Sequence, residues 1–196
     1  MSSVVGSQVP RHRVAAAYSV SAGGDAGELG RAYGLTPDPW QQQVLDDWLA
    51  VGGNGRLASG VCGVFVPRQN GKNAILEIVE LFKATIQGRR ILHTAHELKS
   101  ARKAFMRLRS FFENERQFPD LYRMVKSIRA TNGQEAIVLH HPDCATLSVS
   151  VVVRVGVLSS LWPVAGVLLA GLRLMIWCVM RLRSCRMSSW RLCFLP

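Results

Sequence analysis

Apolar residues along the chain follow two kinds of pattern, one typical of helices and the other of buried strands. They recur every three or four residues within 40–49, 75–86 and 98–112, which predicts three amphipathic helices. Residues 61–66 and 90–95 are instead short, mostly apolar runs, as expected for strands buried on both faces of a sheet. Strands that alternate with helices in this way predict an α/β fold with a parallel sheet.

The first helix has recognisable signals at both ends. Thr36 is a suitable cap and Pro37 a suitable first residue, because Thr side chains accept hydrogen bonds from the first turn and Pro has no N–H to leave unpaired. Trp40 begins its apolar face and serves as a core anchor. We expect this helix to end near Gly52-Gly53.

The segments outside the three helices are less regular. Residues 1–30 show little periodicity, and Gly23-Gly24 interrupts what there is, so we expect a flexible leader and ordered structure from Leu35 onward. Toward the other end, Asn132-Gly133 predicts a turn before a strand at 136–139. The ordered domain would then comprise residues 31–143.

The segment between the first apolar run and the second helix combines residues that suit a phosphate group. Residues 66–73 read Val-Pro-Arg-Gln-Asn-Gly-Lys-Asn. A bound phosphate requires inward-pointing backbone N–H groups, a glycine for close approach, a helix N-terminus and a cation. Gly71 and Lys72 supply the glycine and the cation, while Asn73 stands where Ser or Thr usually holds Mg²⁺. Strand, loop and helix in this order predict a phosphate-binding loop.

Two departures from the general motif leave an alternative open. Val66 replaces the first glycine of G-x-x-x-x-G-K-[ST], and Asn73 replaces its hydroxyl residue. A Gly-Lys pair before a helix is common, so the segment is also compatible with a turn whose lysine is solvated. The preceding apolar run and the following amphipathic helix favour the phosphate loop, because the motif requires that context.

The order of these motifs resembles the ATPase part of the large terminase subunit of tailed bacteriophages, the motor that packages viral DNA. That family often shows a Pro-Arg-x-x-Gly-Lys run followed by Ser, Thr or Asn, which residues 67–73 match. Its upstream Pro-Trp-Gln segment is matched at residues 39–41. Downstream, Thr94-Ala95, Ala101-Arg102 and Phe105 fit the strand and helix that follow the loop. The resemblance spans residues 35–139.

This resemblance implies a P-loop NTPase-type parallel sheet with flanking helices, which binds ATP and Mg²⁺ in the host bacterial cytoplasm. Gln41 would contact adenine, Arg68 and Lys72 would be the catalytic groups at the phosphates, and Asn73 would ligate Mg²⁺. The implied partners are double-stranded viral DNA, the portal protein and the small terminase subunit, with no membrane. The loop residues implied to bind the nucleotide are Arg68, Gln69, Asn70, Gly71, Lys72 and Asn73.

Two assignments stay open within this interpretation. A helicase or another P-loop ATPase would share the upstream glutamine and the strand, loop and helix. Basic residues of the helix at 98–112 suit a solvated face or a DNA-binding track, and we favour the solvated face because helix exteriors are commonly basic. They are Arg102, Lys103, Arg107 and Arg109. His93 we interpret as a packing residue.

Composition divides the chain of 196 residues in two. Residues 1–143 hold 18 basic and all 13 acidic residues, typical of a basic soluble domain that permits a polyanionic partner. Residues 144–196 hold six Arg and no Asp, Glu, Lys, Asn, Gln, His or Tyr. A P-loop ATPase requires a carboxylate pair at the end of a further strand, yet no acidic residue follows Asp143. We therefore expect an ATPase fragment with little or no hydrolysis, lacking those acids and the family's nuclease domain.

The tail at 144–196 has two possible explanations. If translation starts at the third base of each codon, the codons of Met175-Ile176 must encode Asp and those of Trp177-Cys178 must encode Val. Permitted codons for the residues that follow then give an apolar strand that ends in Asp-Glu. This favours out-of-frame translation that begins between Cys144 and Arg154, with a tail not expected to fold natively. Alternatively, residues 155–179 would anchor a small basic protein in a membrane, although Arg173 falls within that span.

Overall fold

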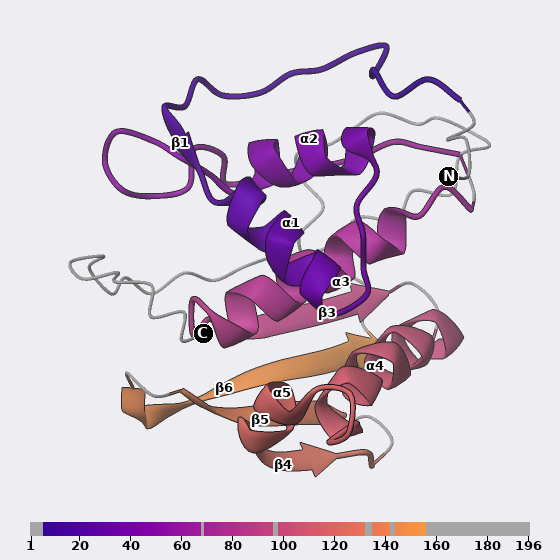
Figure 1. The fold of residues 1–196 in the computed structure, drawn as a ribbon, viewed down its shortest axis with the longest axis vertical. Coiled ribbons are helices and arrows are strands. Elements are labelled where there is room, and N and C mark those ends of the chain that lie inside the picture. Colours follow the sequence, from indigo (N-terminus) through magenta and orange to yellow (C-terminus); the bar gives the residue numbers. More distant parts are fainter. Residues whose placement is uncertain (1–5, 68, 96–97, 132–134, 142–143, 156–196) are drawn as a thin grey trace.

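A computed structural model of the chain describes residues 6–67, 69–95, 98–131, 135–141 and 144–155. For His141 and residues 144–155 it describes the backbone only. The described residues form a mixed α/β fold, so the fold class expected from the sequence is confirmed at this level. Helix α3 lies between a helical group and a sheet (Figure 1). The helical group contains α1 (Gly23–Ala32) and α2 (Pro39–Trp48); the other elements are α3 (Lys72–Thr85), β3 (Ile91–Ala95), α4 (Leu98–Glu113), α5 (Pro119–Arg123), β4 (Val125–Arg129), β5 (Ala136–His141) and β6 (Cys144–Val155).

The sheet is mixed rather than parallel. Its strand order is β3-β6-β5-β4, in which β3 and β6 are parallel while β6, β5 and β4 pair antiparallel. Short connections join β4 to β5 and β5 to β6, and strands joined by a hairpin run antiparallel. Among the described strands, the parallel arrangement expected from the sequence is therefore confined to the β3 and β6 pair.

The apolar run at 61–66 is not a strand, which corrects one expectation. The backbone there is irregular, and Val61 is 91% exposed and Phe65 75% exposed. The described neighbour of β3 is β6, which pairs with it from Ile91 to Ala95. A continuous apolar run satisfies only one requirement of a strand, since its N–H and C=O groups also need a partner in a ladder.

Strand β6 extends the sheet past residue 143, where we expected the native fold to end. It lies between β3 and β5, so the first twelve residues of the expected tail are part of the sheet. Its sequence CATLSVSVVVRV is rich in Val, a residue that packs well on a pleated surface. Residues 156–196, with most of the alternative membrane segment and of the out-of-frame peptide, lie outside the described residues. No helix among those that the structure describes is long and apolar enough to cross a bilayer.

Ordered structure begins before Leu35, contrary to the expected leader. Strand β1 (Val20–Ser21) pairs antiparallel with β2 (Ala50–Val51), and α1 follows at once. Ser21 Oγ accepts the N–H of Gly23 at 3.0 Å and donates to the carbonyl of Asp46 at 2.6 Å. A Cβ atom on Gly23 would overlap the backbone of Asp46, so this glycine allows α1 to pack closely on α2. The glycines that suggested a flexible segment are part of a tight helix contact.

Helix α2 is confirmed, although it begins and ends at other residues than expected. Its cap is Asp38 and its first residue is Pro39, two positions after Thr36 and Pro37. The Asp38 N–H donates to Gln41 Oε1 at 2.8 Å, which forms half of a capping box. The helix ends at Trp48 rather than near Gly52.

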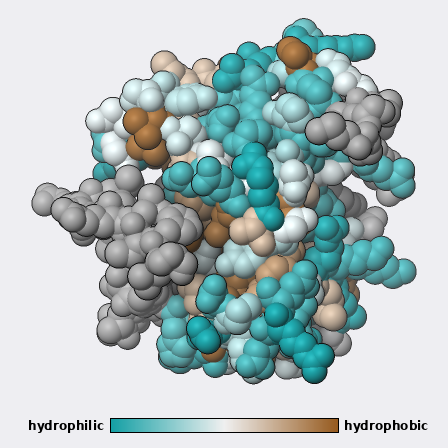
Figure 2. All heavy atoms as spheres, in the orientation of Figure 1, coloured by the Kyte–Doolittle hydropathy of each residue, from teal (hydrophilic) through white to brown (hydrophobic). Residues whose placement is uncertain are grey.

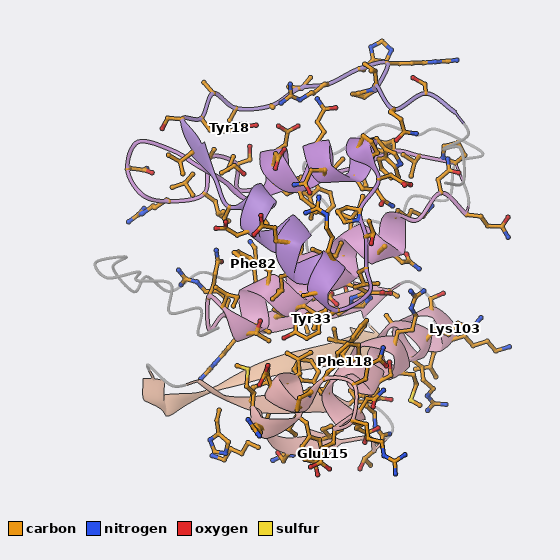
Figure 3. The ribbon with its side chains drawn as sticks, viewed as in Figure 1. Tyr18, Tyr33, Phe82, Lys103, Glu115 and Phe118 are labelled. Carbon is orange, nitrogen blue, oxygen red and sulfur yellow. The ribbon has the colours of Figure 1, made fainter. Side chains whose placement is uncertain are left out.

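Two hydrophobic clusters share α3, so this helix is buried along most of its length. One face of α3 packs on α1 and α2, and another packs on β3, β5 and α4. The contact between Tyr33 and Phe118 also joins the two halves, with ring centroids 5.2 Å apart at 74° (Figure 3). On the face shown in Figure 2, the described residues are mostly hydrophilic, with separate apolar patches between them. The fully buried large side chains are Phe105, Phe112, Leu45, Leu49, Ile75, Ile78, Leu81, Ile91, Leu108, Leu121, Ile137 and Leu139.

Candidate functional site

The N-terminus of α3 has a backbone conformation that requires a glycine. Gly71 is its cap and lies in the left-handed region, at φ 71° and ψ 13°. Two positions earlier, Gln69 is also left-handed at φ 64°. Two left-handed residues within three positions turn the chain sharply before the helix. The Gly71 carbonyl then accepts the N–H of Ala74 at 3.0 Å, which closes the first turn.

Gln41 connects this cap to the beginning of α2. Its Nε2 donates to the Gly71 carbonyl at 3.1 Å, across 30 positions of sequence, and its Oε1 accepts the Asp38 N–H. The residue is 5% exposed. The N-terminal ends of α2 and α3 therefore lie together at one end of the molecule (Figure 1).

The remaining loop residues face solvent to different degrees. Gln69, Asn70 and Asn73 are exposed, whereas Lys72 is half-buried at the first position of α3. Within the described residues no hydrogen bond or ion pair occupies the Lys72 ammonium. Arg68 lies outside the described residues. A lysine beside a helix N-terminus is a favourable arrangement for an anion, because the ammonium and the helix dipole both attract negative charge.

The carboxyl ends of two strands lie at the same end as this loop. Helix α3 is followed by a short connection and then β3, so Ala95 returns toward the start of α3 (Figure 1). Because β6 is parallel to β3, its last residues lie beside Thr94 and Ala95. Ligands of open α/β sheets bind outside the carboxyl ends of parallel strands. Gly71, Lys72 and the Thr94-Ala95 pair, which the sequence singled out separately, are thus at the same end of the fold.

Two buried carboxylates of α3, Glu77 and Glu80, form ion pairs that join this helix to its neighbours; the Arg107 side chain is 57% exposed. Glu77 is 6% exposed in its side chain, and Arg107 of α4 contacts both its carboxylate oxygens, Nε to Oε1 at 2.9 Å and Nη2 to Oε2 at 3.0 Å. Glu80 is buried in the same way and pairs with His93 of β3, Oε1 to Nδ1 at 2.6 Å. These two pairs fix how α3 is placed against α4 and β3.

Burial and charge shift the pKa values of Glu77 and His93. Burial raises the pKa of Glu77 above its ordinary value; the Arg107 guanidinium opposes this shift, and the Glu80 carboxylate adds to it. For His93, burial alone would lower the pKa, but the hydrogen bond and charge of Glu80, with the charge of Glu77, outweigh it and raise the pKa. The folded protein therefore binds the His93 proton more tightly than the unfolded chain does.

The sequence alone does not predict an ion pair for either His93 or Arg107. We expected His93 to be a packing residue and Arg107 to belong to a solvated face, and both predictions miss a carboxylate partner on α3. A usable signal was present, since Glu77 and Glu80 fall among the apolar residues of a helix with more than one buried face. Acidic residues in such positions are almost always paired.

The other basic residues of α4 differ in exposure: Arg102 and Lys103 are exposed, whereas the Arg109 side chain is 27% exposed. Arg109 pairs with Glu113 one turn later, at 2.7 Å, and Lys103 projects from the helix into solvent (Figure 3). Arg102 and Lys103 agree with the expected solvated face and Arg109 does not, while a nucleic-acid contact along this helix stays a prediction.

The described residues can be compared with the ligand sets that metal ions need. Among them no group of three or more His, Cys, Asp or Glu side chains could hold a cation. Asn73 contributes one exposed carboxamide oxygen in the first turn of α3. Mg²⁺ prefers oxygen ligands and retains several waters, so this residue fits a cation that arrives with a triphosphate rather than a resident one.

The chain matches no protein-family model, no curated protein and no solved structure. The geometry of the loop and its own sequence therefore carry the functional argument.

Proposed function

We propose that the chain is a nucleoside-triphosphate-binding module of the P-loop type, derived from the ATPase part of a large terminase subunit of a tailed bacteriophage. The observation that carries the proposal is the start of α3. There a left-handed Gly71 caps a 14-residue helix, and the half-buried Lys72 follows with no partner among the described residues. These are the groups that a triphosphate needs: a close backbone, a helix N-terminus and a cation.

Each residue of the loop has a distinct role in this proposal. The N–H groups of the first turn of α3 and the Lys72 ammonium would bind the phosphate oxygens, and Arg68 would stabilise charge at the γ-phosphate. Asn73 would hold Mg²⁺ together with phosphate oxygens; the cation supplies charge neutralisation when bound. Gln69 and Asn70 would add polar contacts from the turn. The parallel β3 and β6 pair supports the finer expectation of a P-loop NTPase-type sheet.

The terminase assignment is supported by the order of the motifs. Pro39-Trp40-Gln41, the loop at 67–73, Thr94-Ala95 and the Ala101-Arg102 pair occur in the family's sequence. The proposal brings with it double-stranded viral DNA, the portal protein and the small subunit as partners, in the host bacterial cytoplasm. Exposed Lys99 and Lys103 on α4 are available to a DNA backbone.

Binding of MgATP is the appropriate test, because the proposed groups at the start of α3 act on the phosphates of the bound nucleotide. We expect Lys72→Ala to abolish binding measured by calorimetry, since the substitution removes the ammonium and leaves the backbone. Lys103→Ala is the matched control, an exposed lysine on the outer face of α4, and it should bind as the wild type does. Unchanged ATP affinity in Lys72→Ala would remove the phosphate-loop assignment.

Two further measurements separate the terminase from other P-loop proteins. Restoration of DNA packaging into empty phage heads, once the coding frame after residue 143 is corrected, would support the motor over a helicase. Sequencing of the coding DNA decides whether such an alternative frame exists. Absence of an open frame that encodes Asp-Glu after an apolar strand would contradict the out-of-frame origin of the tail.

A further inference from the structure

We propose that Gln41 is a positioning residue of the nucleotide site, which holds the phosphate loop through the Gly71 carbonyl rather than reading the adenine ring. This inference rests on the proposed function, because it concerns how the same loop is kept ready for a triphosphate. It differs from the role that the terminase resemblance implies for Gln41.

Both polar atoms of the Gln41 side chain are engaged inside the protein. Oε1 accepts the Asp38 N–H at 2.8 Å, and Nε2 donates to the Gly71 carbonyl at 3.1 Å. With 5% of its surface exposed, the residue has little area left for a ligand. A contact to adenine would have to give up one of these bonds, and a buried group left without a partner is costly.

The bond to Gly71 acts on the part of the loop that faces an anion. The Gly71 carbonyl has two donors, Gln41 Nε2 and the Ala74 N–H at 3.0 Å. The peptide unit is planar, so fixing the direction of this C=O also fixes the N–H of Lys72, which points the opposite way. That N–H has no acceptor among the described residues and is directed away from the helix, where a phosphate would bind.

Gln41→Glu separates the two bonds of the side chain. The carboxylate still accepts from the Asp38 N–H, but it cannot donate to the Gly71 carbonyl and repels it. Gln43→Glu is the matched control, because Gln43 lies on the same helix, is half-buried and has no hydrogen bond of its side chain among the described residues. Affinities for MgATP, MgGTP and magnesium tripolyphosphate are measured by calorimetry for both variants and the wild type.

We expect Gln41→Glu to lose affinity for all three ligands by the same factor, about tenfold. The three ligands share their phosphates, and the lost hydrogen bond orients the loop that binds those phosphates. Gln43→Glu should bind like the wild type. A loss confined to ATP would mean that Gln41 reads adenine, and it would overturn the proposal. Equal affinities of Gln41→Glu and the wild type would overturn it as well.

The pH profile gives a second readout that a general loss of packing would not produce. Below the pKa of the substituted carboxyl group, its protonated form can donate to the Gly71 carbonyl again, so the affinity ratio to the wild type should return toward one. Gln41→Met, which has a similar volume and no donor, should show the loss without recovery at low pH, and it serves if Gln41→Glu does not fold. A pH-independent loss in Gln41→Glu would contradict the proposal.

Amide hydrogen exchange distinguishes failure of this inference from failure of the proposed function. The Ala74 amide should exchange faster in Gln41→Glu than in Gln43→Glu, because its acceptor is less well held. If the wild type binds none of the three ligands but this difference is seen, the proposed function fails while the positioning of the loop stands. An unchanged Ala74 exchange rate would overturn the positioning role itself.

Discussion

Gly71 and Gln41 approach each other so closely that a Cβ atom on Gly71 would lie 2.5 Å from Gln41 Nε2. Gly71 is also left-handed at φ 71°, a conformation that costs other residues about 1–2 kcal/mol. The cap of α3 therefore requires glycine for two separate reasons. One is the shape of its own backbone and the other is the neighbouring amide.

The two reasons can be separated by a double-mutant cycle. We expect Gly71→Ala to lower the free energy of unfolding by roughly 2–3 kcal/mol, measured by urea denaturation, from left-handed strain plus displacement of Gln41. In a Gln41→Ala background the same substitution should cost about 1–2 kcal/mol, because only the strain remains. An equal cost in both backgrounds would show that the contact with Gln41 contributes nothing.

Two neighbouring glycines, Gly23 and Gly24, test the close packing of α1 on α2. Gly23 faces the Asp46 backbone, where a methyl group has no room, whereas Gly24 is exposed with open space around its Cβ position. Gly23→Ala should destabilise the protein by about 1–3 kcal/mol through overpacking. Gly24→Ala should stabilise it by about 0.5–1 kcal/mol, since Ala has the better helix propensity. Thermal denaturation of both variants checks this; the same sign of change in both would contradict the packing.

Helices α3 and α4 could be predicted from the sequence because each buries a continuous apolar stripe, with Ala101, Phe105, Leu108 and Phe112 on one face of α4. Helix α1 could not be predicted, because glycines in a sequence usually indicate a flexible segment. Only the structure shows that the Asp46 backbone lies against Gly23 and leaves no room for a side chain there. The buried positions of α1 are small residues that carry no hydrophobic signal.

The run at 61–66 differs from the predicted strand for the opposite reason. It has the apolar residues of a strand, but strand pairing depends on a partner elsewhere in the chain, and the described partner of β3 is β6. Of the candidate site, Gly71 and Lys72 could be located from local spacing. The bond from Gln41 to Gly71 could not, because 30 residues separate them and only the packing of α2 on α3 brings them together.

The ion pair between α3 and α4 predicts a large difference between two arginines. Arg107→Ala leaves the buried Glu77 carboxylate without its partner, and we expect a loss of about 1–3 kcal/mol in urea denaturation. Glu77→Gln in the same chain should recover part of this loss by removing the unpaired charge. Arg123→Ala is the control, because its pair with Asp120 is exposed at 3.9 Å and should contribute about 0–0.5 kcal/mol. Equal losses for Arg107→Ala and Arg123→Ala would contradict a stabilising pair between Arg107 and the buried Glu77 carboxylate.

The pair of His93 with Glu80 predicts a stability contribution that is lost as pH rises. The folded state raises the pKa of His93 above its ordinary 6.5, so the protonated form is bound more tightly in the folded than in the unfolded protein. Its contribution is therefore fully present below pH 6.5 and declines as pH rises through the higher folded pKa.

The free energy of unfolding of the wild type minus that of His93→Gln should fall over this window, measured from about pH 5 to about pH 9. Because the raised pKa of Glu77 also lowers stability with rising pH, both proteins should carry Glu77→Gln, and His140→Gln on exposed His140 of β5 is the matched control. A difference that stays constant or grows with pH would mean that the 2.6 Å contact does not favour protonated His93.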